Sequence, residues 1–158
     1  MSVHVYIFAG EQNSGKTSVI QFLSNATKQS IKRKKVEISK EVKMLVEVLF
    51  KTQSLQEAGI SADDFKEIVQ KKLSQKHFSA VVIALRTENN INGLPAADCY
   101  IDKFAKFGWN IKYIAELGGG TKLQSYCKQN QYAYKSFKRT KKLPDSKLFA
   151  GIKKFFYF

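Results

Sequence analysis

The residues best suited to chemistry in this chain lie near its start, where the stretch GEQNSGKT covers residues 10–17. Two glycines, Gly10 and Gly15, bracket four residues, and Lys16 and Thr17 follow directly. Glycines allow the backbone to fold so tightly that its N–H groups point at one anion. A lysine adds a positive charge, and a threonine hydroxyl is a suitable ligand for Mg²⁺. The spacing therefore predicts a loop that holds phosphate groups together with Mg²⁺.

The sequence on either side of this loop has the pattern that a phosphate-binding loop needs. Residues 3–9 are almost entirely apolar, which is typical of a central parallel strand buried on both faces. After the loop, an apolar stripe at helical spacing predicts a helix that continues to about residue 30; its members are Val19, Ile20, Phe22, Leu23 and Ala26. The start of that helix would direct its unpaired N–H groups and its dipole at the same anion.

With this strand and helix around it, the motif resembles the P-loop NTPase superfamily, over roughly the first thirty residues. The resemblance implies that the chain binds ATP, or another nucleoside triphosphate, together with Mg²⁺. It also implies a three-layer α/β/α fold with a mainly parallel sheet. The residues that it implies for nucleotide binding are Gly10, Glu11, Gln12, Asn13, Ser14, Gly15, Lys16, Thr17 and Ser18, with Thr17 as a Mg²⁺ ligand.

The rest of the chain alternates between strand and helix patterns, which independently favours one α/β domain over residues 1–158. We expect strands at residues 35–39, 78–85 and 109–117. We expect helices at residues 39–50, where Ser39 is a plausible N-cap, and from Ser61, where Asp64 completes a capping box. Further helices are expected after Pro95, ending before Gly108, and at residues 148–156, with a polar and aromatic segment of helical character at 121–142.

The bulk composition narrows the class of protein. The chain has 158 residues, 44% of them hydrophobic, which is enough for a globular core. No apolar run is long enough to cross a bilayer, and the first residues lack the basic region of a signal peptide. The two cysteines show no metal-binding or disulfide spacing, which favours reduced thiols in a cytoplasmic protein.

The net charge of +14 favours anionic partners, including nucleic acid and phosphorylated small molecules. The aromatic residues near the C-terminal end alternate with lysines, a pattern that suits a surface on which bases stack; they are Tyr126, Tyr132, Tyr134 and Phe137. The same aromatic residues equally suit the core of the last helices.

The strand at residues 78–85 is followed by Arg86, Thr87 and Glu88, without an acid at its end. This argues against a motor ATPase, and the absence of guanine-recognition motifs argues against a GTPase. The arginine resembles the one that small nucleoside and nucleotide kinases carry after the equivalent strand, which implies that Arg86 contacts the transferred phosphoryl group. Glu88 is a candidate metal ligand, because ligands of open α/β sheets bind at the ends of the strands.

The same resemblance to small kinases implies three further features. Glu37, at the end of the second expected strand, takes the place of a general base. Arg139, next to Lys138, lies in a basic stretch that resembles a lid over the phosphates. The two helices expected between residues 39 and 75 take the place of the region that binds the acceptor.

Two hypotheses follow from the sequence. The first is a small kinase-like phosphotransferase that moves the γ-phosphoryl group of ATP to a nucleoside, a nucleotide or a similar small anionic acceptor. The second is a nucleic-acid-associated P-loop NTPase, or a regulatory nucleotide-binding module, that uses the basic surface. Lys16, Arg86, Glu37 and Arg139 are the catalytic candidates of the first hypothesis.

Overall fold

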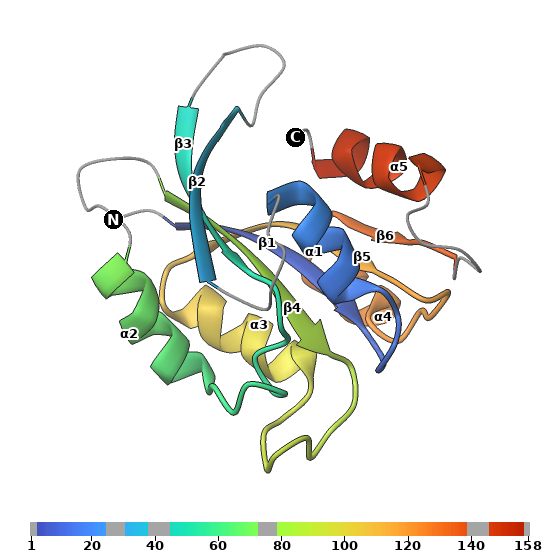
Figure 1. Cartoon of the computed structure of the whole chain (residues 1–158). Coiled ribbons are helices and arrows are strands. Elements are labelled where there is room, and N and C mark those ends of the chain that lie inside the picture. Colours follow the sequence, from blue (N-terminus) through green and yellow to red (C-terminus); the bar gives the residue numbers. More distant parts are fainter. Residues whose placement is uncertain (1–2, 25–30, 38–44, 73–78, 139–145, 157–158) are drawn as a thin grey trace.

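The computed structural model describes residues 3–24, 31–37, 45–72, 79–138 and 146–156 (Figure 1). Within these ranges, six strands form one sheet in the order β2-β3-β4-β1-β5-β6. The strands are β1 (Val3–Gly10), β2 (Ile31–Glu37), β3 (Leu45–Lys51), β4 (Ser79–Arg86), β5 (Asn110–Glu116) and β6 (Tyr134–Ser136). Five of them are parallel, and β2 pairs with β3 in the antiparallel sense at one edge.

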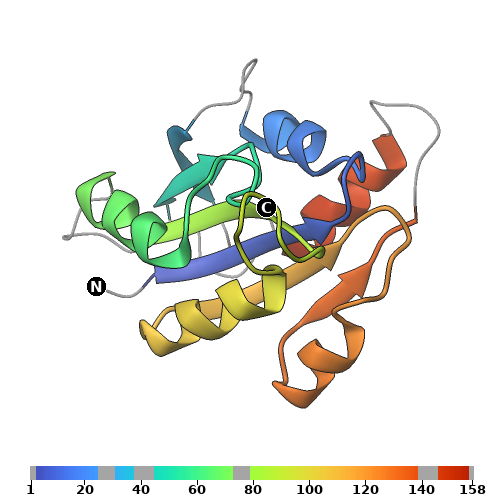
Figure 2. The same ribbon diagram turned by 90° about the horizontal axis from the view of Figure 1, so that it is seen from below.

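Helices cover both faces of the sheet, as Figure 2 shows. The helices are α1 (Lys16–Ser24), α2 (Ala62–Lys72), α3 (Ala97–Lys106), α4 (Gln124–Gln129) and α5 (Ser146–Phe156). Buried residues of α2, α3 and α4 pack on one face, and those of α1 and α5 pack on the other. This is a three-layer α/β arrangement around a mainly parallel sheet.

The two cores follow from the alternation of side chains along the central strands. In β1, Val5 and Ile7 contact the α2–α3 side, whereas Tyr6 and Phe8 contact the α1–α5 side. Because both faces are covered by helices, β1 and β4 are apolar at nearly every position. The continuous apolar runs of the sequence are thus the signature of strands at the centre of the sheet.

The helix expected at residues 39–50 is wrong, because Leu45–Lys51 forms β3. Its side chains at Val48 and Phe50 are buried on one face of the sheet, and Leu49 is buried on the other. A strand buried on both faces gives a run of apolar residues that periodicity cannot separate from a buried helix. Residues 38–44 lie outside the described ranges.

Other boundaries also differ from expectation. The second strand runs from Ile31 to Glu37 instead of 35–39, because residues 31–37 pair with residues 45–51 along the whole length of β3 at the sheet edge. The segment expected to be helical at 121–142 instead contains the short helix α4 followed by strand β6. Helix α1 is described as far as Ser24, and residues 25–30 lie outside the described ranges.

Several local expectations are confirmed. Ser61 and Asp64 form a reciprocal capping box at α2: the Asp64 N–H donates to Ser61 Oγ at 3.1 Å, and the Ser61 N–H donates to Asp64 Oδ2 at 3.3 Å. Gly108 has a φ of 79° directly after the C-cap of α3, the position that glycine favours. The strands expected at 78–85 and 109–117 correspond to β4 and β5, and the C-terminal helix to α5.

Among the described helices, none has both the length and the apolar character that crossing a membrane requires.

Candidate functional site

The glycine loop, Gly10–Thr17, follows β1 at the centre of the parallel sheet. Strand β1 pairs with β4 on one side and with β5 on the other. Because all three strands are parallel, the segments that follow them meet at one edge of the sheet. The main chain ties them together here: the Thr87 N–H donates to Gly10 O at 3.2 Å, and the Leu117 N–H donates to Ala9 O at 2.8 Å. Ligands of open α/β sheets bind beyond the carboxyl ends of the strands, and the glycine loop lies there.

Close approaches within the loop explain its residue types. A Cβ on Gly10 would lie 2.5 Å from Ser14 Oγ, so only glycine fits there. Gly15 has a φ of 96°, which only glycine adopts readily. Helix α1 begins at Lys16, and its first turn has backbone N–H groups without partners inside the helix. The loop therefore has the shape and the donors that a phosphate group needs.

Lys16 is 6% exposed, and its ammonium group lies over the loop. Its Nζ donates to Gly10 O at 3.1 Å, to Glu11 O at 2.7 Å and to Ser14 Oγ at 3.1 Å. Burial lowers the pKa of Lys16 to about 8, against the raising effect of Glu57 and other nearby carboxylates. The buried ammonium thus has neutral oxygens as its hydrogen-bond partners, and a phosphate would give it an anionic one.

A cavity of about 480 Å³ lies beside the loop and the start of α1. Its lining residues are Gln12, Asn13, Ser14, Gly15, Lys16, Thr17, Ser18 and Glu57. Seven of these eight are expected nucleotide-binding residues, and the eighth, Glu57, comes from the segment between β3 and α2. The cavity brings backbone N–H groups, an ammonium, a hydroxyl and a carboxylate together. These groups suit a polyphosphate with Mg²⁺, with the Thr17 hydroxyl as the protein ligand that could hold the ion.

Among the described residues, no cluster of three or more His, Cys, Asp or Glu side chains has the arrangement of a metal site. A Mg²⁺ ion that is shared with phosphate oxygens does not need such a cluster, since it takes one or two protein ligands and keeps several waters. The residues around the cavity fit that mode of binding.

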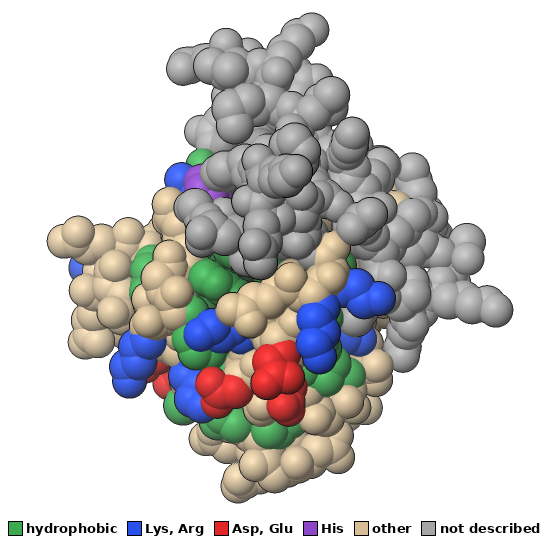
Figure 3. Space-filling view, turned by 90° about the vertical axis from the view of Figure 1, so that its left-hand side faces the viewer, with side chains coloured by type: hydrophobic (Ala, Val, Ile, Leu, Met, Phe, Trp, Pro, Cys, Tyr) green, Lys and Arg blue, Asp and Glu red, His purple; other side chains and the backbone are tan. Residues whose placement is uncertain are grey.

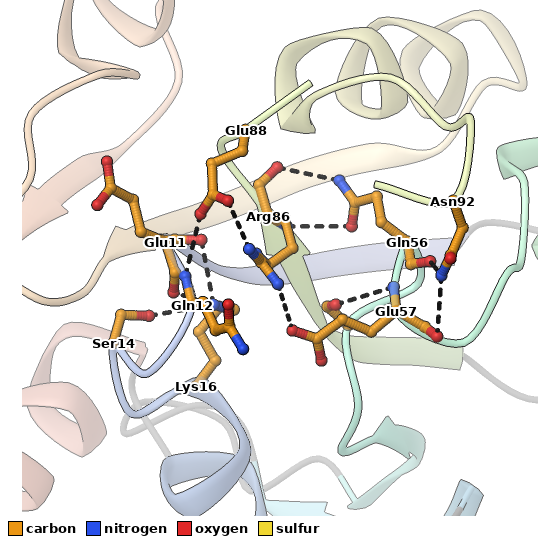
Figure 4. A network of polar contacts seen from close by, with 11 residues as sticks. Glu11, Gln12, Ser14, Lys16, Gln56, Glu57, Arg86, Glu88 and Asn92 are labelled. Carbon is orange, nitrogen blue, oxygen red and sulfur yellow. Dashed lines mark hydrogen bonds and ion pairs between the residues drawn. The ribbon is translucent and has the colours of Figure 1, made fainter. Parts of the chain in front are cut away.

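Arg86, the last residue of β4, forms the centre of a network of ion pairs (Figure 4). It is 4% exposed. Its Nη1 donates to Glu57 Oε1 at 2.7 Å, and its Nη2 donates to Glu88 Oε2. Both carboxylate side chains are about one third exposed, at 31% and 32%. Arg86 Nε is buried, and it has no hydrogen-bond partner among the described residues.

Glu88 connects this network to the glycine loop. The Gln12 N–H donates to Glu88 Oε1 at 3.0 Å, while the second oxygen of Glu88 pairs with Arg86. The hydrogen bond from Arg86, followed by the one from Gln12, lowers the pKa of Glu88. Glu88 is therefore ionised and engaged with Arg86 and the loop backbone in this structure.

Gln56 holds the segment that carries Glu57 against the end of β4. Its side chain is fully buried, and its amide binds the backbone of Arg86 in both directions. The Arg86 N–H donates to Gln56 Oε1 at 3.0 Å, and Gln56 Nε2 donates to Arg86 O at 3.0 Å and to Pro95 O at 3.2 Å. Asn92 Nδ2 in turn donates to Gln56 O at 2.9 Å. Glu57 is thus positioned by a buried hydrogen-bonded neighbour (Figure 4).

Glu37 does not belong to this site. It pairs with Leu45 at the start of β3, and Glu47 of the same strand pairs with Ser79 at the start of β4. The glycine loop follows the other ends of these parallel strands. Because β2 runs antiparallel, its last residue lies at the end of the sheet opposite to the loop, which corrects the assignment of Glu37 as a general base.

The structure places only some of the other predicted site residues near the glycine loop. The structure brings Arg86 and Glu88 to the glycine loop, although Glu88 binds Arg86 and the loop backbone in this structure. Arg139 lies outside the described residues. The region expected to bind the acceptor contains strand β3 in place of its first helix, and helix α2 packs on the sheet through Phe65 and Val69.

The aromatic residues considered for base stacking pack against the core. Phe137 is buried, and Tyr126, Tyr132 and Tyr134 are partly buried against the α2–α4 side of the sheet. The Tyr126 hydroxyl donates to Asp102 Oδ1 at 2.6 Å, and the Tyr134 hydroxyl donates to Glu116 Oε1 at 3.1 Å. These contacts favour the core interpretation of the aromatic segment.

On the face drawn in Figure 3, the described basic side chains lie among acidic ones. Lys103 and Asp63 also form an exposed ion pair between helices α3 and α2, with Nζ and Oδ2 2.7 Å apart. The described part of this face is therefore of mixed charge, without a broad field of one sign.

Sequence reasoning missed Glu57 and Gln56. Both residues follow a segment that resembled a helix. A residue that follows a helix is not expected to lie at the ends of the strands. If residues 45–51 are interpreted as a buried strand, Glu57, which follows it, is expected at the same edge of the sheet as the glycine loop.

Comparison of the chain with models of known protein families, with curated proteins and with solved structures gives no match.

Proposed function

We propose that the glycine loop binds the triphosphate of ATP, or of another nucleoside triphosphate, with Mg²⁺, and that the chain transfers the γ-phosphoryl group to a small acceptor. The observation that supports this most is the shared cavity. It joins the glycine loop and the buried Lys16 to a carboxylate, Glu57, from a separate part of the chain, and that carboxylate is paired with Arg86.

The loop and the cations have distinct parts in this proposal. The backbone N–H groups of the loop and of the first turn of α1 bind the phosphate oxygens. Lys16 leaves its carbonyl partners for a phosphate oxygen, which is a stronger acceptor because it is charged. The Thr17 hydroxyl would hold Mg²⁺ in part, and the ion would supply positive charge to the phosphate oxygens.

Glu57 is the residue best placed to accept a proton in this reaction. The acceptor oxygen forms a bond to the γ-phosphorus, and the bond from that phosphorus to the β–γ bridging oxygen breaks, which releases the nucleoside diphosphate. The proton of the acceptor hydroxyl passes to the Glu57 carboxylate, which lines the cavity. Arg86, next to Glu57, stabilises the negative charge on the transferred group.

The acceptor is a small molecule with a hydroxyl or phosphate group, in keeping with the resemblance to nucleoside and nucleotide kinases. In the present geometry water has the same access to Glu57, so hydrolysis competes with transfer. The net charge of +14 supports the second hypothesis, an NTPase that acts with nucleic acid. The packing of its proposed stacking residues against the core weakens that hypothesis.

The test is an assay of ADP release from ATP and Mg²⁺ with nucleosides, nucleoside monophosphates, polynucleotides or no acceptor, at two salt concentrations. The expected result is ADP release that depends on a small acceptor and is lost in Lys16→Met. The matched control is Lys128→Met, which removes an exposed lysine of α4.

Stimulation by polynucleotide alone, weakening steeply with salt, would replace the first hypothesis by the second. Turnover at the same rate with and without acceptors would identify a simple NTPase. Absence of ATP binding in calorimetry would reject both hypotheses.

A further inference from the structure

A second pocket, of about 220 Å³, lies on the β5 side of the glycine loop. It is lined by the loop residues Glu11, Gln12 and Ser14 and by residues 116–120 and Lys122. Gln12 and Ser14 also line the larger cavity that contains Lys16, so the two pockets meet at the same loop. A ligand bound over the loop can therefore extend into both.

The wall of this pocket is a turn of three glycines after β5, which we call the glycine turn (Gly118, Gly119 and Gly120). A Cβ on Gly118 would lie 3.0 Å from the Cβ of Ser14, and a Cβ on Gly120 would lie 2.6 Å from a carboxylate oxygen of Glu116. The turn thus packs closely against both the glycine loop and Glu116. Its exposed surface is backbone, which leaves room for a ligand close to the chain.

Glu116 fixes the position of the turn. Its side chain is 1% exposed, and its two oxygens accept hydrogen bonds from the Lys122 N–H at 2.9 Å and the Leu123 N–H at 2.8 Å. The Tyr134 hydroxyl also donates to it, at 3.1 Å. A buried carboxylate with three donors is satisfied within the protein, so its role is to hold the pocket wall in place.

The rim of the pocket carries the exposed ion pair of Lys122 with Glu11, with Nζ and Oε1 2.6 Å apart. These side chains are 52% and 62% exposed, so they are free to exchange partners at little cost. They span the gap between the glycine turn and the glycine loop. A ligand group in the pocket would lie under this pair, within reach of a donor and an acceptor.

The proposed chemistry sets the direction of a bound triphosphate. The γ-phosphate must lie beside Glu57, which lines the larger cavity and pairs with Arg86 at the end of β4, on one side of the loop. The pocket at the glycine turn lies at the end of β5, on the other side. With the γ-phosphate toward Arg86 and Glu57, the opposite end of the nucleotide extends toward the glycine turn.

We propose that this second pocket is the subsite for the nucleoside, with the base and ribose between the glycine loop and the glycine turn, under the Lys122–Glu11 pair. The inference rests on the proposed binding of a nucleoside triphosphate. Pockets that hold a whole drug-sized ligand typically have volumes of about 300–1,000 Å³. The second pocket is smaller than this, so its volume suits one part of the nucleotide. The phosphates occupy the larger cavity.

The experiment compares Mg–ATP with Mg–tripolyphosphate, which has the phosphates and no nucleoside. Calorimetry on the wild-type chain should show ATP binding about 10-fold or more tightly, as expected for one or two added hydrogen bonds and some apolar contact. Backbone amide NMR signals of residues 118–122 should shift with ATP and stay in place with tripolyphosphate. The signals of the glycine loop should shift with both.

Two variants test the assignment. Lys122→Gln should lower the ratio of ATP to tripolyphosphate affinity about 3- to 10-fold through loss of a hydrogen bond. Lys128→Gln, an exposed lysine of α4 away from the pocket lining, should leave the ratio unchanged. Gly120→Ala, whose Cβ would displace Glu116, should bring the ratio close to one; a circular dichroism spectrum checks its fold.

Each result decides between the subsite and the proposed function. If both ligands bind equally and shift the same amides, the subsite is overturned and phosphate binding stands. The subsite is also overturned if ATP binds more tightly but moves amides outside residues 116–122. If neither ligand binds, the proposed function fails, and the subsite fails with it.

Discussion

The buried Gln56 side chain connects two parts of the candidate site, and Gln56→Leu removes that connection at nearly constant side-chain volume. In the wild-type chain its amide binds the Arg86 N–H, the Arg86 carbonyl and the Pro95 carbonyl, at 3.0, 3.0 and 3.2 Å. Leucine has no polar group to replace the amide. Because Gln56 is fully buried, water does not replace its amide as the partner of these three backbone groups.

The expected loss of stability follows from these three groups. A buried polar group that loses its partner costs about 1–3 kcal/mol, so three groups cost roughly 3–6 kcal/mol when some relaxation is allowed. Burial of the apolar leucine side chain offsets about 1.5–3 kcal/mol of this. The net decrease in the free energy of unfolding should therefore be about 1.5–3 kcal/mol, a large share of the 5–15 kcal/mol typical of a domain.

Urea unfolding of the wild-type chain, Gln56→Leu and Gln70→Leu measures the effect. Gln70 is exposed on α2, so the same substitution there should change the free energy of unfolding by about 0.5 kcal/mol or less. Under conditions where Gln56→Leu is folded, we also expect slower nucleotide turnover, because Glu57 is the next residue in the chain. A decrease of less than about 1 kcal/mol, with a normal unfolding slope, would refute the view that Gln56 holds these segments together.

Three further predictions concern the cavity. Lys16→Met should weaken Mg–ATP binding about 10- to 100-fold in calorimetry, since a charged hydrogen bond contributes about 1.5–3 kcal/mol, whereas Lys128→Met should bind normally; equal affinities would remove Lys16 from the site. Glu57→Gln should lower kcat about 10²- to 10⁴-fold with little change in KM, as expected for a general base, and Glu67→Gln, on the exposed face of α2, should not; a wild-type kcat in Glu57→Gln would assign the proton transfer elsewhere. Burial lowers the Lys16 pKa from 10.5 to about 8, so between these values the unfolded chain holds the extra proton. The free energy of unfolding of the ligand-free chain should then rise with pH across this window, by up to about 1.4 kcal/mol per pH unit from this group. Urea unfolding at pH 7.5 and 9.5 should show this rise in the wild-type chain and a smaller one in Lys16→Met, and parallel changes would contradict it.

The local patterns of the sequence were sufficient for most of the fold. The apolar run before Gly10 and the apolar stripe after Lys16 predicted β1 and α1, because a central strand and a helix packed on a sheet each need their own spacing of apolar residues. The capping box at Ser61 and the glycine after α3 marked helix ends through contacts between residues close in sequence. Such contacts are readable without a structure.

The exception in the fold was β3, which resembled a helix. Its residues are apolar because both faces of the strand are covered, and whether a short apolar run becomes a strand or a helix depends on what covers it. That decision is made by the neighbouring strand and the helices on both faces, which are distant in sequence.

The sequence by itself determined the glycine loop, since the loop's shape depends on glycines, a lysine and a threonine within eight residues of one another. Only the tertiary structure decided which other side chains join it. The antiparallel pairing of β2 with β3 places Glu37 at the far end of the sheet, and the parallel pairing of β3 with β4 brings Glu57 to Arg86. The direction in which each strand runs sets the end of the sheet at which its last residue lies, and pairing between strands distant in sequence fixes that direction.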